Sequence, residues 1–284
     1  MVKELLRPAT PEDAVALLAK HKGKAKVLAG GTDLVVLMRA GKIAPEVIVS
    51  LNGIAALRSL SFNPDDGLRI GALTTHSELI ENGDVQARYP VLAETARALA
   101  GPPVRNAASV AGNLCHAAPS ADFGPPLLAL DASVAVLGPG GERTVPLTDF
   151  FKGPNQTALA EDEILTEIRV PTPAEGSGAG YQKLGVRSAM EIAMVSAAAS
   201  MTKTNGTCSD VRVALGAVAP APFLAKSAAA AVEGKAPSAE VFARAGEAAA
   251  AESRPISDIR ASAEYRKKMV AVMTRRALAR AAGL

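Results

Sequence analysis

Tryptophan is absent from this chain of 284 residues, and aromatic residues make up only 3% of it. So few aromatic rings argue against a surface that stacks the bases of single-stranded nucleic acid. Lys and Arg together number 31 against 28 Asp and Glu, which leaves a net charge of +3. So small an excess does not require a polyanionic partner, and we expect no nucleic acid among the partners.

Cysteine is nearly absent, with only Cys115 and Cys208, and no CxxC pair occurs. Two distant cysteines do not form the disulfide framework of a small secreted protein, and they fit a reducing compartment. They are also too few for an iron–sulfur cluster, which usually takes four thiolates. The chain therefore cannot ligate such a cluster by itself.

Long apolar runs are missing too. The segments LVVLM (34–38) and AAAAV (228–232) are far shorter than the roughly 20 residues that a membrane helix needs. The N-terminal stretch MVKELLRPATPEDAV lacks the apolar core of a signal peptide. We therefore expect a cytoplasmic protein without a membrane span.

The patterns that are present predict strands alternating with helices. Thr10-Pro11 begins a helix, because Thr caps well and Pro suits the first helical position. Two strands at 24–29 and 46–51, which stand before and after a short helix, suggest a small parallel sheet. Further elements are predicted, in order, as a short helix 33–39, a strand 68–73, a short helix ending at 80, a helix 90–100, a hairpin 133–137 and 143–146, a strand 163–170, strands 180–185, 193–202 and 211–217, and helices 226–233, 238–252 and 261–282. Residues 104–124 are predicted as a long loop, and 171–180 as a linker.

The first candidate site is the turn AGGTD (29–33) between a strand and a short helix. Glycines let a phosphate approach the backbone without obstruction from a Cβ atom. The turn is neither a Rossmann fingerprint, since no GxGxxG follows a strand, nor a P-loop, since no GK[ST] occurs. By itself the pattern fits an ordinary strand-to-helix turn equally well.

The second candidate is the small-residue stretch RNAASVAGN (105–113), which continues through Leu114, Cys115 and His116 to Asp122. Ser109 and Asn113 offer side-chain hydrogen bonds, and Asp122 offers an acceptor for a sugar-like hydroxyl. Asp122 suits an N-cap of the following helix equally well. A nucleophile or metal-ligand role for Cys115 and His116 is disfavoured, because adjacent residues point apart and no further ligands are evident.

Together the two stretches resemble a known family. AGGTDL (29–34) followed by VRNAASVAGNLCHAAPSAD (104–122) is similar to the FAD-binding subunit of the molybdenum hydroxylases, which include xanthine dehydrogenase and aerobic carbon monoxide dehydrogenase with its medium subunit. The resemblance continues, in order, through GALTTH (71–76), LLALDA (127–132), YQKLGVRSAMEIAMVSAA (181–198) and ASAEYRKKMV (261–270). It therefore spans essentially the whole chain.

The resemblance implies an α+β fold: a two-part FAD-binding domain of the vanillyl-alcohol-oxidase type, then a C-terminal α+β domain. We expect the first domain over residues 1–172, with subdomains of about 1–55 and 56–172, and the second over 176–284.

The same resemblance assigns the cofactor contacts. The cofactor is FAD, and the residues implied are Ala29, Gly30, Gly31, Thr32, Asp33 and Leu34 at the pyrophosphate, Ser109, Val110, Ala111, Gly112 and Asn113 at the second phosphate and ribityl loop, Asp122 at a flavin-side hydroxyl, Leu165 along the cofactor, and Tyr181 and Lys183 by the isoalloxazine. The family often has two glycines where this chain has Ala111-Gly112, which puts the geometry of that loop in question. His76 is either a structural residue or a flavin neighbour.

The implied function is a relay. A large subunit with a molybdenum cofactor oxidises the substrate, a small subunit with two [2Fe–2S] clusters carries the electrons, and the FAD of this chain passes them to an external acceptor. The assembly implied is a dimer of heterotrimers, and this chain contributes no acid–base residue. Two alternatives stay open: a self-sufficient flavin-dependent oxidase or reductase of the same fold, and a non-catalytic interaction subunit. The substrate and the acceptor are not readable from this chain.

Overall fold

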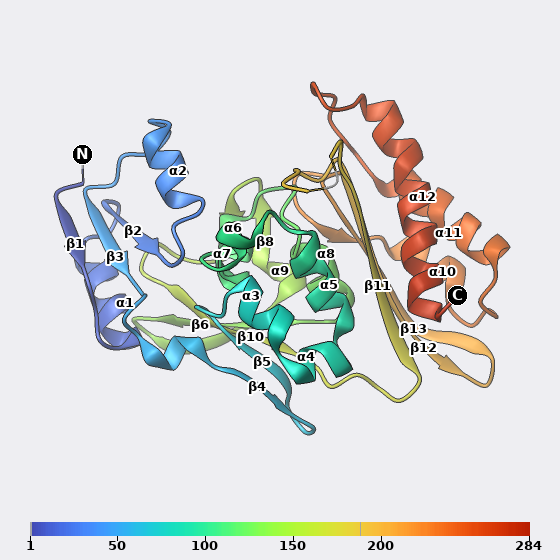
Figure 1. Cartoon of the computed structure of the whole chain (residues 1–284), viewed down its shortest axis with the longest axis horizontal. Coiled ribbons are helices and arrows are strands. Elements are labelled where there is room, and N and C mark those ends of the chain that lie inside the picture. The colour runs from blue at the N-terminus through green and yellow to red at the C-terminus, as the bar shows by residue number, and fades with distance from the viewer. Residues whose placement is uncertain (1, 188) are drawn as a thin grey trace.

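The structure is a computed structural model that describes residues 2–187 and 189–284. The three larger β-sheets follow one another along the long axis of the molecule, from the N-terminal strands to the C-terminal helices (Figure 1). This mixture of helices and sheets confirms the predicted α+β fold.

The first sheet is parallel, as predicted, with the order β1-β3-β2. Its strands are β1 (Glu4–Leu6), β2 (Ala25–Leu28) and β3 (Val47–Ser50). Helix α1 (Pro11–Lys20) buries Ala14, Val15 and Leu18 in the core of the N-terminal half, and Thr10 caps the helix by accepting a hydrogen bond from the Asp13 N–H. The prediction missed β1, because three residues with two of them exposed carry almost no hydrophobic pattern.

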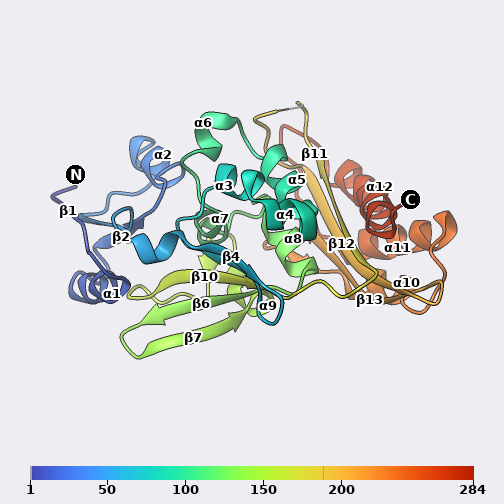
Figure 2. The ribbon, with the colours of Figure 1, turned by 60° about the horizontal axis from the view of Figure 1, so that its bottom comes forward.

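The second sheet has five antiparallel strands in the order β4-β5-β10-β6-β7. They are β4 (Leu60–Asn63), β5 (Gly67–Gly71), β6 (Ser133–Gly138), β7 (Gly141–Pro146) and β10 (Ile164–Val170). The hairpin of β6 and β7 confirms the predicted one. Figure 2 shows the sheet below a layer of helices, which are α3 (His76–Glu81), α4 (Gly83–Arg88), α5 (Pro90–Ala98), α7 (Val110–His116) and α8 (Gly124–Ala129).

The prediction of one long loop over 104–124 is wrong. Short helices α6 (Pro102–Arg105) and α7 (Val110–His116) occupy much of this stretch. Their small residues carry no amphipathic period, but Val110, Ala111 and Leu114 are buried, so burial in the core stabilises α7. Short elements also connect β7 to β10: α9 (Leu147–Phe150), β8 (Phe151–Gly153) and β9 (Gln156–Thr157).

The third sheet is antiparallel, with the order β11-β12-β13-β14. Its strands are β11 (Ser177–Leu184), β12 (Val195–Thr204), β13 (Thr207–Gly216) and β14 (Phe223–Leu224). One face is covered by α10 (Lys226–Val232), α11 (Ala239–Glu252) and α12 (Ala263–Ala282). No helix among the described residues is long and apolar enough to cross a membrane.

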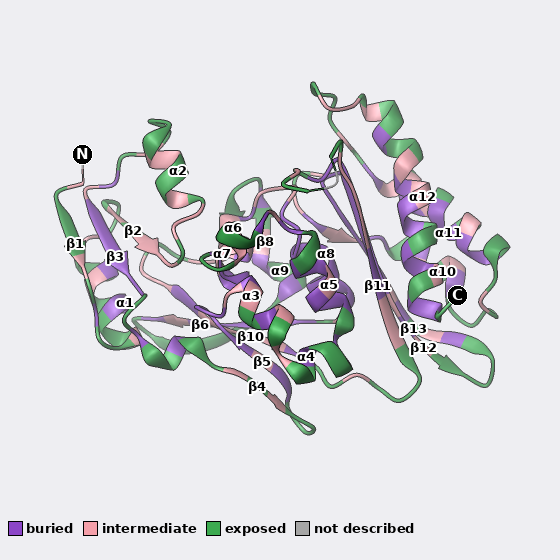
Figure 3. Ribbon diagram, viewed as in Figure 1, coloured by how far each residue is buried: buried purple, intermediate pink, exposed green. Residues whose placement is uncertain are grey.

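Two hydrophobic cores fill the molecule, and buried residues run through the centre of both halves (Figure 3). The first core fills the N-terminal half and also takes in Tyr181, Ala198 and Ala214 from the third sheet. The second lies between that sheet and α10–α12. The third sheet is therefore buried on both faces, and it holds the two halves together. The predicted boundaries, 1–172 and 176–284, stay a proposal that these cores support.

Candidate cofactor site

The first predicted loop is shaped by its two glycines. It connects the end of β2 to α2 (Leu34–Arg39). Gly31 has a φ of +74°, a left-handed conformation that favours glycine. Gly30 lies so close to the second loop that an added Cβ would stand 1.8 Å from the Ala107 carbonyl oxygen. The two predicted loops therefore meet backbone to backbone.

Two side chains fix the first loop further. Asn52, just after β3, donates a hydrogen bond of 3.1 Å from its amide nitrogen to the Ala29 carbonyl oxygen. Asp33 lies 3.7 Å from the Nε2 atom of His116 at the end of α7. The turn is thus linked both to the neighbouring strand and to the second loop.

The second predicted loop is the start of a helix. Ser109 is the N-cap of α7, and its Oγ accepts a hydrogen bond of 3.0 Å from the Gly112 N–H. Ala111 is 3% exposed, lies within the helix and is not among the left-handed residues. Its methyl group therefore fits without strain at the place where the family often has glycine. Two backbone hydrogen bonds hold the start of α7 against the segment before α3. The Val110 N–H donates to the Thr74 carbonyl oxygen at 3.2 Å, and the His76 N–H donates to the Ala108 carbonyl oxygen at 3.1 Å.

Asp122 belongs to a buried polar cluster rather than to a helix cap. The N-cap position of α8 is Phe123, and no side chain caps that helix, so the capping alternative is wrong. Asn113 accepts a hydrogen bond of 3.2 Å from the Phe123 N–H, which fixes the turn that carries Asp122. The Asp122 carboxylate accepts hydrogen bonds from the Tyr181 hydroxyl (2.9 Å) and the Lys183 ammonium (3.0 Å).

This cluster is almost closed to solvent. The Asp122 and Lys183 side chains are each 10% exposed. Burial raises the pKa of the Asp122 carboxyl, although the Lys183 ammonium and the Tyr181 hydroxyl both favour the ionised form. Burial and the neighbouring Asp122 carboxylate raise the pKa of Tyr181. Tyr181 therefore stays a neutral donor, and the paired charges join β11 to the N-terminal half.

Lys183 also reaches the C-terminal end of α5, where it donates to the Ala98 carbonyl oxygen at 3.3 Å. Arg105 holds the same helix end, because its Nη1 atom donates to the carbonyl oxygens of Arg97 and Leu99 at 3.0 Å each. Lys183 thus joins the end of α5, Asp122 and β11.

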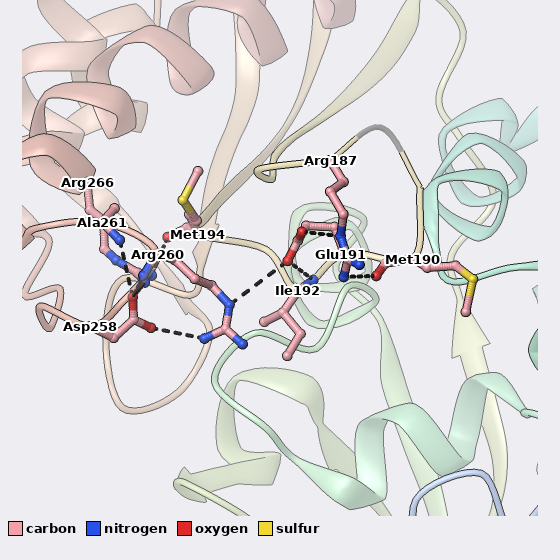
Figure 4. A network of polar contacts seen from close by, with 9 residues as sticks. All are labelled: Arg187, Met190, Glu191, Ile192, Met194, Asp258, Arg260, Ala261 and Arg266. Carbon is pink, nitrogen blue, oxygen red and sulfur yellow. Dashed lines mark hydrogen bonds and ion pairs between the residues drawn. The ribbon is translucent and has the colours of Figure 1, made fainter.

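The segment between β11 and β12 is held by an ionic network (Figure 4). Glu191 accepts a hydrogen bond of 2.8 Å from Arg187 and lies 3.9 Å from Arg260. Asp258 pairs with Arg260 at 3.2 Å and with Arg266 at 2.8 Å, and Arg266 also donates to the Met194 carbonyl oxygen. The network anchors the strand ends that carry Lys183 to the start of α12.

A hollow of about 210 Å³ lies where the two loops meet. Its lining residues come from both loops and from the strand ends beside them: Ala29, Gly30, Asn52, Arg58, Leu73, Thr75, Asn106, Ala107 and Ser109. Asn52, Arg58 and Thr75 were not among the predicted site residues. Asn52 could have been predicted, because the carboxyl ends of parallel strands lie at one edge of their sheet and both β2 and β3 lead into the site.

Leu165 lies apart from these contacts. It is a β10 residue, 3% exposed, in the core of the N-terminal half, and its predicted contact with the cofactor stays a prediction.

Burial raises the pKa of the Cys115 thiol to about 12, which does not suit a nucleophile. His76 is 1% exposed and stacks on Phe123 with ring centroids 4.9 Å apart. Among the described residues, no group of three or more His, Cys, Asp and Glu side chains is placed to hold a metal ion.

Two family models match the chain in succession. The FAD-binding domain of molybdopterin dehydrogenases matches residues 1–173, and the C-terminal domain of the carbon monoxide dehydrogenase flavoprotein matches residues 180–281.

Individual relatives match this chain along nearly its whole length. The carbon monoxide dehydrogenase medium chain of Hydrogenophaga pseudoflava is 38% identical over 271 residues, which are 95% of this chain and 94% of the relative. The xanthine dehydrogenase FAD-binding subunit of Escherichia coli O157:H7 is 35% identical over 276 residues, covering 97% and 94%.

Solved structures give the same result. The carbon monoxide dehydrogenase of H. pseudoflava superposes with a TM-score of 0.96 at 38% identity, covering 99% of this chain and 97% of that chain. Quinoline 2-oxidoreductase of Pseudomonas putida superposes with a TM-score of 0.93 at 29% identity, covering 100% and 97%. The chain therefore belongs to the FAD-binding subunits of the molybdenum hydroxylases, the oxidoreductase family of the carbon monoxide dehydrogenase medium chain, and its cofactor is FAD.

Proposed function

We propose that this chain is the electron-transfer subunit of a molybdenum-containing hydroxylase or dehydrogenase, in which FAD takes electrons from [2Fe–2S] clusters on a partner and passes them to an external acceptor. The observation that carries this proposal is the contact between Gly30 and the backbone of Ala107. It brings the two motifs of the family to one place, and a polar hollow lies between them.

The residues proposed to hold the cofactor fall into two groups. Ala29 to Leu34 and Ser109 to Asn113 hold the diphosphate and the chain next to it. Asp122, Tyr181 and Lys183 hold the flavin end, with Leu165 along the cofactor. The fit is supported by the glycine turn, which brings the backbone of Gly30 against that of Ala107 at the edge of the hollow. It is also supported by the buried Asp122–Lys183 pair, since buried charges of this kind are typical of functional sites.

The clusters are proposed to lie on another chain. The only two cysteines of the sequence are Cys115 and Cys208. Cys115 lies in α7 in the first core region, and Cys208 lies in β13 in the second. Two cysteines in separate cores do not supply the four thiolates of a cluster. We therefore propose a small [2Fe–2S] subunit and a large molybdenum-cofactor subunit as partners, assembled as a dimer of heterotrimers in the cytoplasm.

Isolating the complex through a tag on this chain tests the relay. We expect one larger and one smaller chain to co-purify, with FAD, iron and molybdenum in the same fraction. If the chain is instead isolated alone with FAD and turns over a substrate by itself, it is a self-sufficient flavoenzyme and the relay is wrong.

Lys183 is proposed to adjust the reduction potential of the flavin. Its ammonium lies in a nearly closed cluster, where a positive charge favours the negatively charged reduced cofactor. We expect Lys183→Met to lower the potential by about 30 mV, or about 1.4 kcal/mol for two electrons, in a reductive titration of the isolated chain. Lys152→Met, which removes an exposed lysine of β8, is the control. An unchanged potential in the isolated Lys183→Met chain, together with unchanged turnover of the assembled complex, contradicts this role.

A further inference from the structure

The hollow between the two loops contains one cationic side chain and no carboxylate. Of its nine lining residues, Arg58 alone is charged, and the polar ones are Asn52, Thr75, Asn106 and Ser109. A hollow that combines one guanidinium with neutral hydrogen-bonding groups favours an anionic ligand. Arg58 belongs to neither predicted loop and was not among the expected cofactor contacts.

The backbone around Arg58 is held firmly, although the side chain is exposed. Arg58 ends a 3₁₀ turn (Ala55–Arg58) whose Leu57 is 2% exposed. The Leu57 carbonyl oxygen accepts a hydrogen bond of 2.8 Å from the Leu73 N–H. On the other side, the Ser59 carbonyl oxygen accepts hydrogen bonds from the Gly71 N–H (2.7 Å) and the Thr74 hydroxyl (3.1 Å). Hydrogen bonds on both sides of Arg58 therefore fix the backbone that places this residue at the lining of the hollow.

Arg58 is also free of competing carboxylates. No acidic group lies within 4.0 Å of its side chain among residues 2–187 and 189–284, a range that contains 18 other ion pairs. The other two cations near the loops are engaged, Lys183 by the Asp122 carboxylate and Arg105 by the carbonyl oxygens of Arg97 and Leu99. The two loops thus offer backbone groups and hydroxyls to a diphosphate but no uncommitted positive charge.

We propose that Arg58 is a further cofactor-binding residue, whose guanidinium pairs with the diphosphate of FAD in this hollow. The planar guanidinium presents parallel N–H donors that match phosphate oxygens. This inference rests on the proposed placement of the diphosphate between the two loops. It adds the cation that those loops lack.

The test measures the binding of FAD to the flavin-free full chain. Arg58→Met keeps most of the apolar length of the side chain and removes its charge. We expect FAD to bind about tenfold more weakly at low salt, and we expect the difference to shrink as salt rises, since a partly exposed ion pair is screened. Arg58→Lys should lie between the wild type and Arg58→Met. Arg275→Met is the matched control, because Arg275 is exposed on α12 outside the hollow.

Two competitors identify which part of the cofactor Arg58 contacts. ADP carries the diphosphate, and adenosine does not. We expect Arg58→Met to weaken competition by ADP by the same factor as FAD binding and to leave competition by adenosine unchanged.

FAD affinity within twofold of the Arg275→Met control, or equal losses for ADP and adenosine, would overturn the assignment of Arg58 while leaving the cofactor site in place. A wild-type chain that does not bind FAD at all would contradict the placement of the cofactor itself.

Discussion

The two loops that meet at the site are built in opposite ways. The first, Ala29 to Leu34, is shaped by its backbone: Gly31 is left-handed, Gly30 contacts a neighbouring carbonyl, and the helix that follows, α2, has no buried residue. The second, residues 105–113, is held by the side-chain cap of Ser109 and by the buried Val110 and Ala111. A mutation should therefore damage the first loop by adding atoms and the second by removing them.

Gly30→Ala should have the largest effect on the cofactor. The added methyl group would stand 1.8 Å from the Ala107 carbonyl oxygen and 2.5 Å from its carbon, so the two loops must separate. Forcing atoms into packed structure typically costs about 1–3 kcal/mol or more. We expect FAD to bind about a hundredfold more weakly, measured by titration of the flavin-free chain. Gly140→Ala is the control, because an added Cβ there meets nothing within 4 Å. Equal affinities for both variants would show that the loops do not act together.

The second loop should be sensitive to pH through His76. Its backbone N–H donates a hydrogen bond to the Ala108 carbonyl oxygen, and its ring stacks on Phe123. Its buried Nδ1 atom has no hydrogen-bond partner among residues 2–187 and 189–284. Burial and, to a smaller extent, the charge of Arg105 lower the pKa of His76 to about 4. In the unfolded chain the same ring takes up a proton near pH 6.5. Because the unfolded state then binds more protons, stability falls as the pH falls from about 6.5 towards 4.

This loss should reach roughly 2 kcal/mol between pH 7.5 and pH 5 and about 3 kcal/mol by pH 4. Urea unfolding of the wild type and of His76→Gln at pH 7.5 and pH 5 measures it. The wild type should lose about 2 kcal/mol more than the variant over this interval. This comparison uses only the pH dependence, so it holds even if His76→Gln is less stable throughout. Identical pH dependence in both proteins would show that His76 accepts a proton in the folded state.

The same contrast explains what the sequence could and could not predict. The glycine turn, β2 and β3 were predictable because a strand pattern, two glycines and a second strand stand next to one another in the chain. Helix α7 was not, since its seven residues are mostly small and its stability comes from burial against distant strands. Local patterns do not contain that information.

The residues of the candidate site divide in a similar way. The two loops were found through motifs that lie in one stretch of chain each, and Tyr181 and Lys183 through resemblance to the family. That Asp122 bonds to both of them across about sixty residues of sequence is visible only in three dimensions. Arg58 carries no local signal at all, because a 3₁₀ turn and neighbouring strand ends place it at the hollow.

Ser109→Ala should have the smallest effect of the three. It removes the hydroxyl that accepts the Gly112 N–H at 3.0 Å, and loss of such a cap typically costs about 1 kcal/mol. The buried Val110, Ala111 and Leu114 remain to hold α7, so the helix should persist. We expect the free energy of unfolding in urea to fall by about 1 kcal/mol and FAD affinity to fall only a few-fold, far less than for Gly30→Ala.

Ser262→Ala is the matched control for this variant, because Ser262 caps α12 in the same way, by accepting from the Tyr265 N–H at 3.1 Å, but lies outside the site. It should lose similar stability with unchanged FAD affinity. If Ser109→Ala instead weakened FAD binding as strongly as Gly30→Ala does, the second loop would depend on its cap as much as the first depends on its glycine. The contrast between a loop shaped by backbone and a loop held by its core would then be wrong.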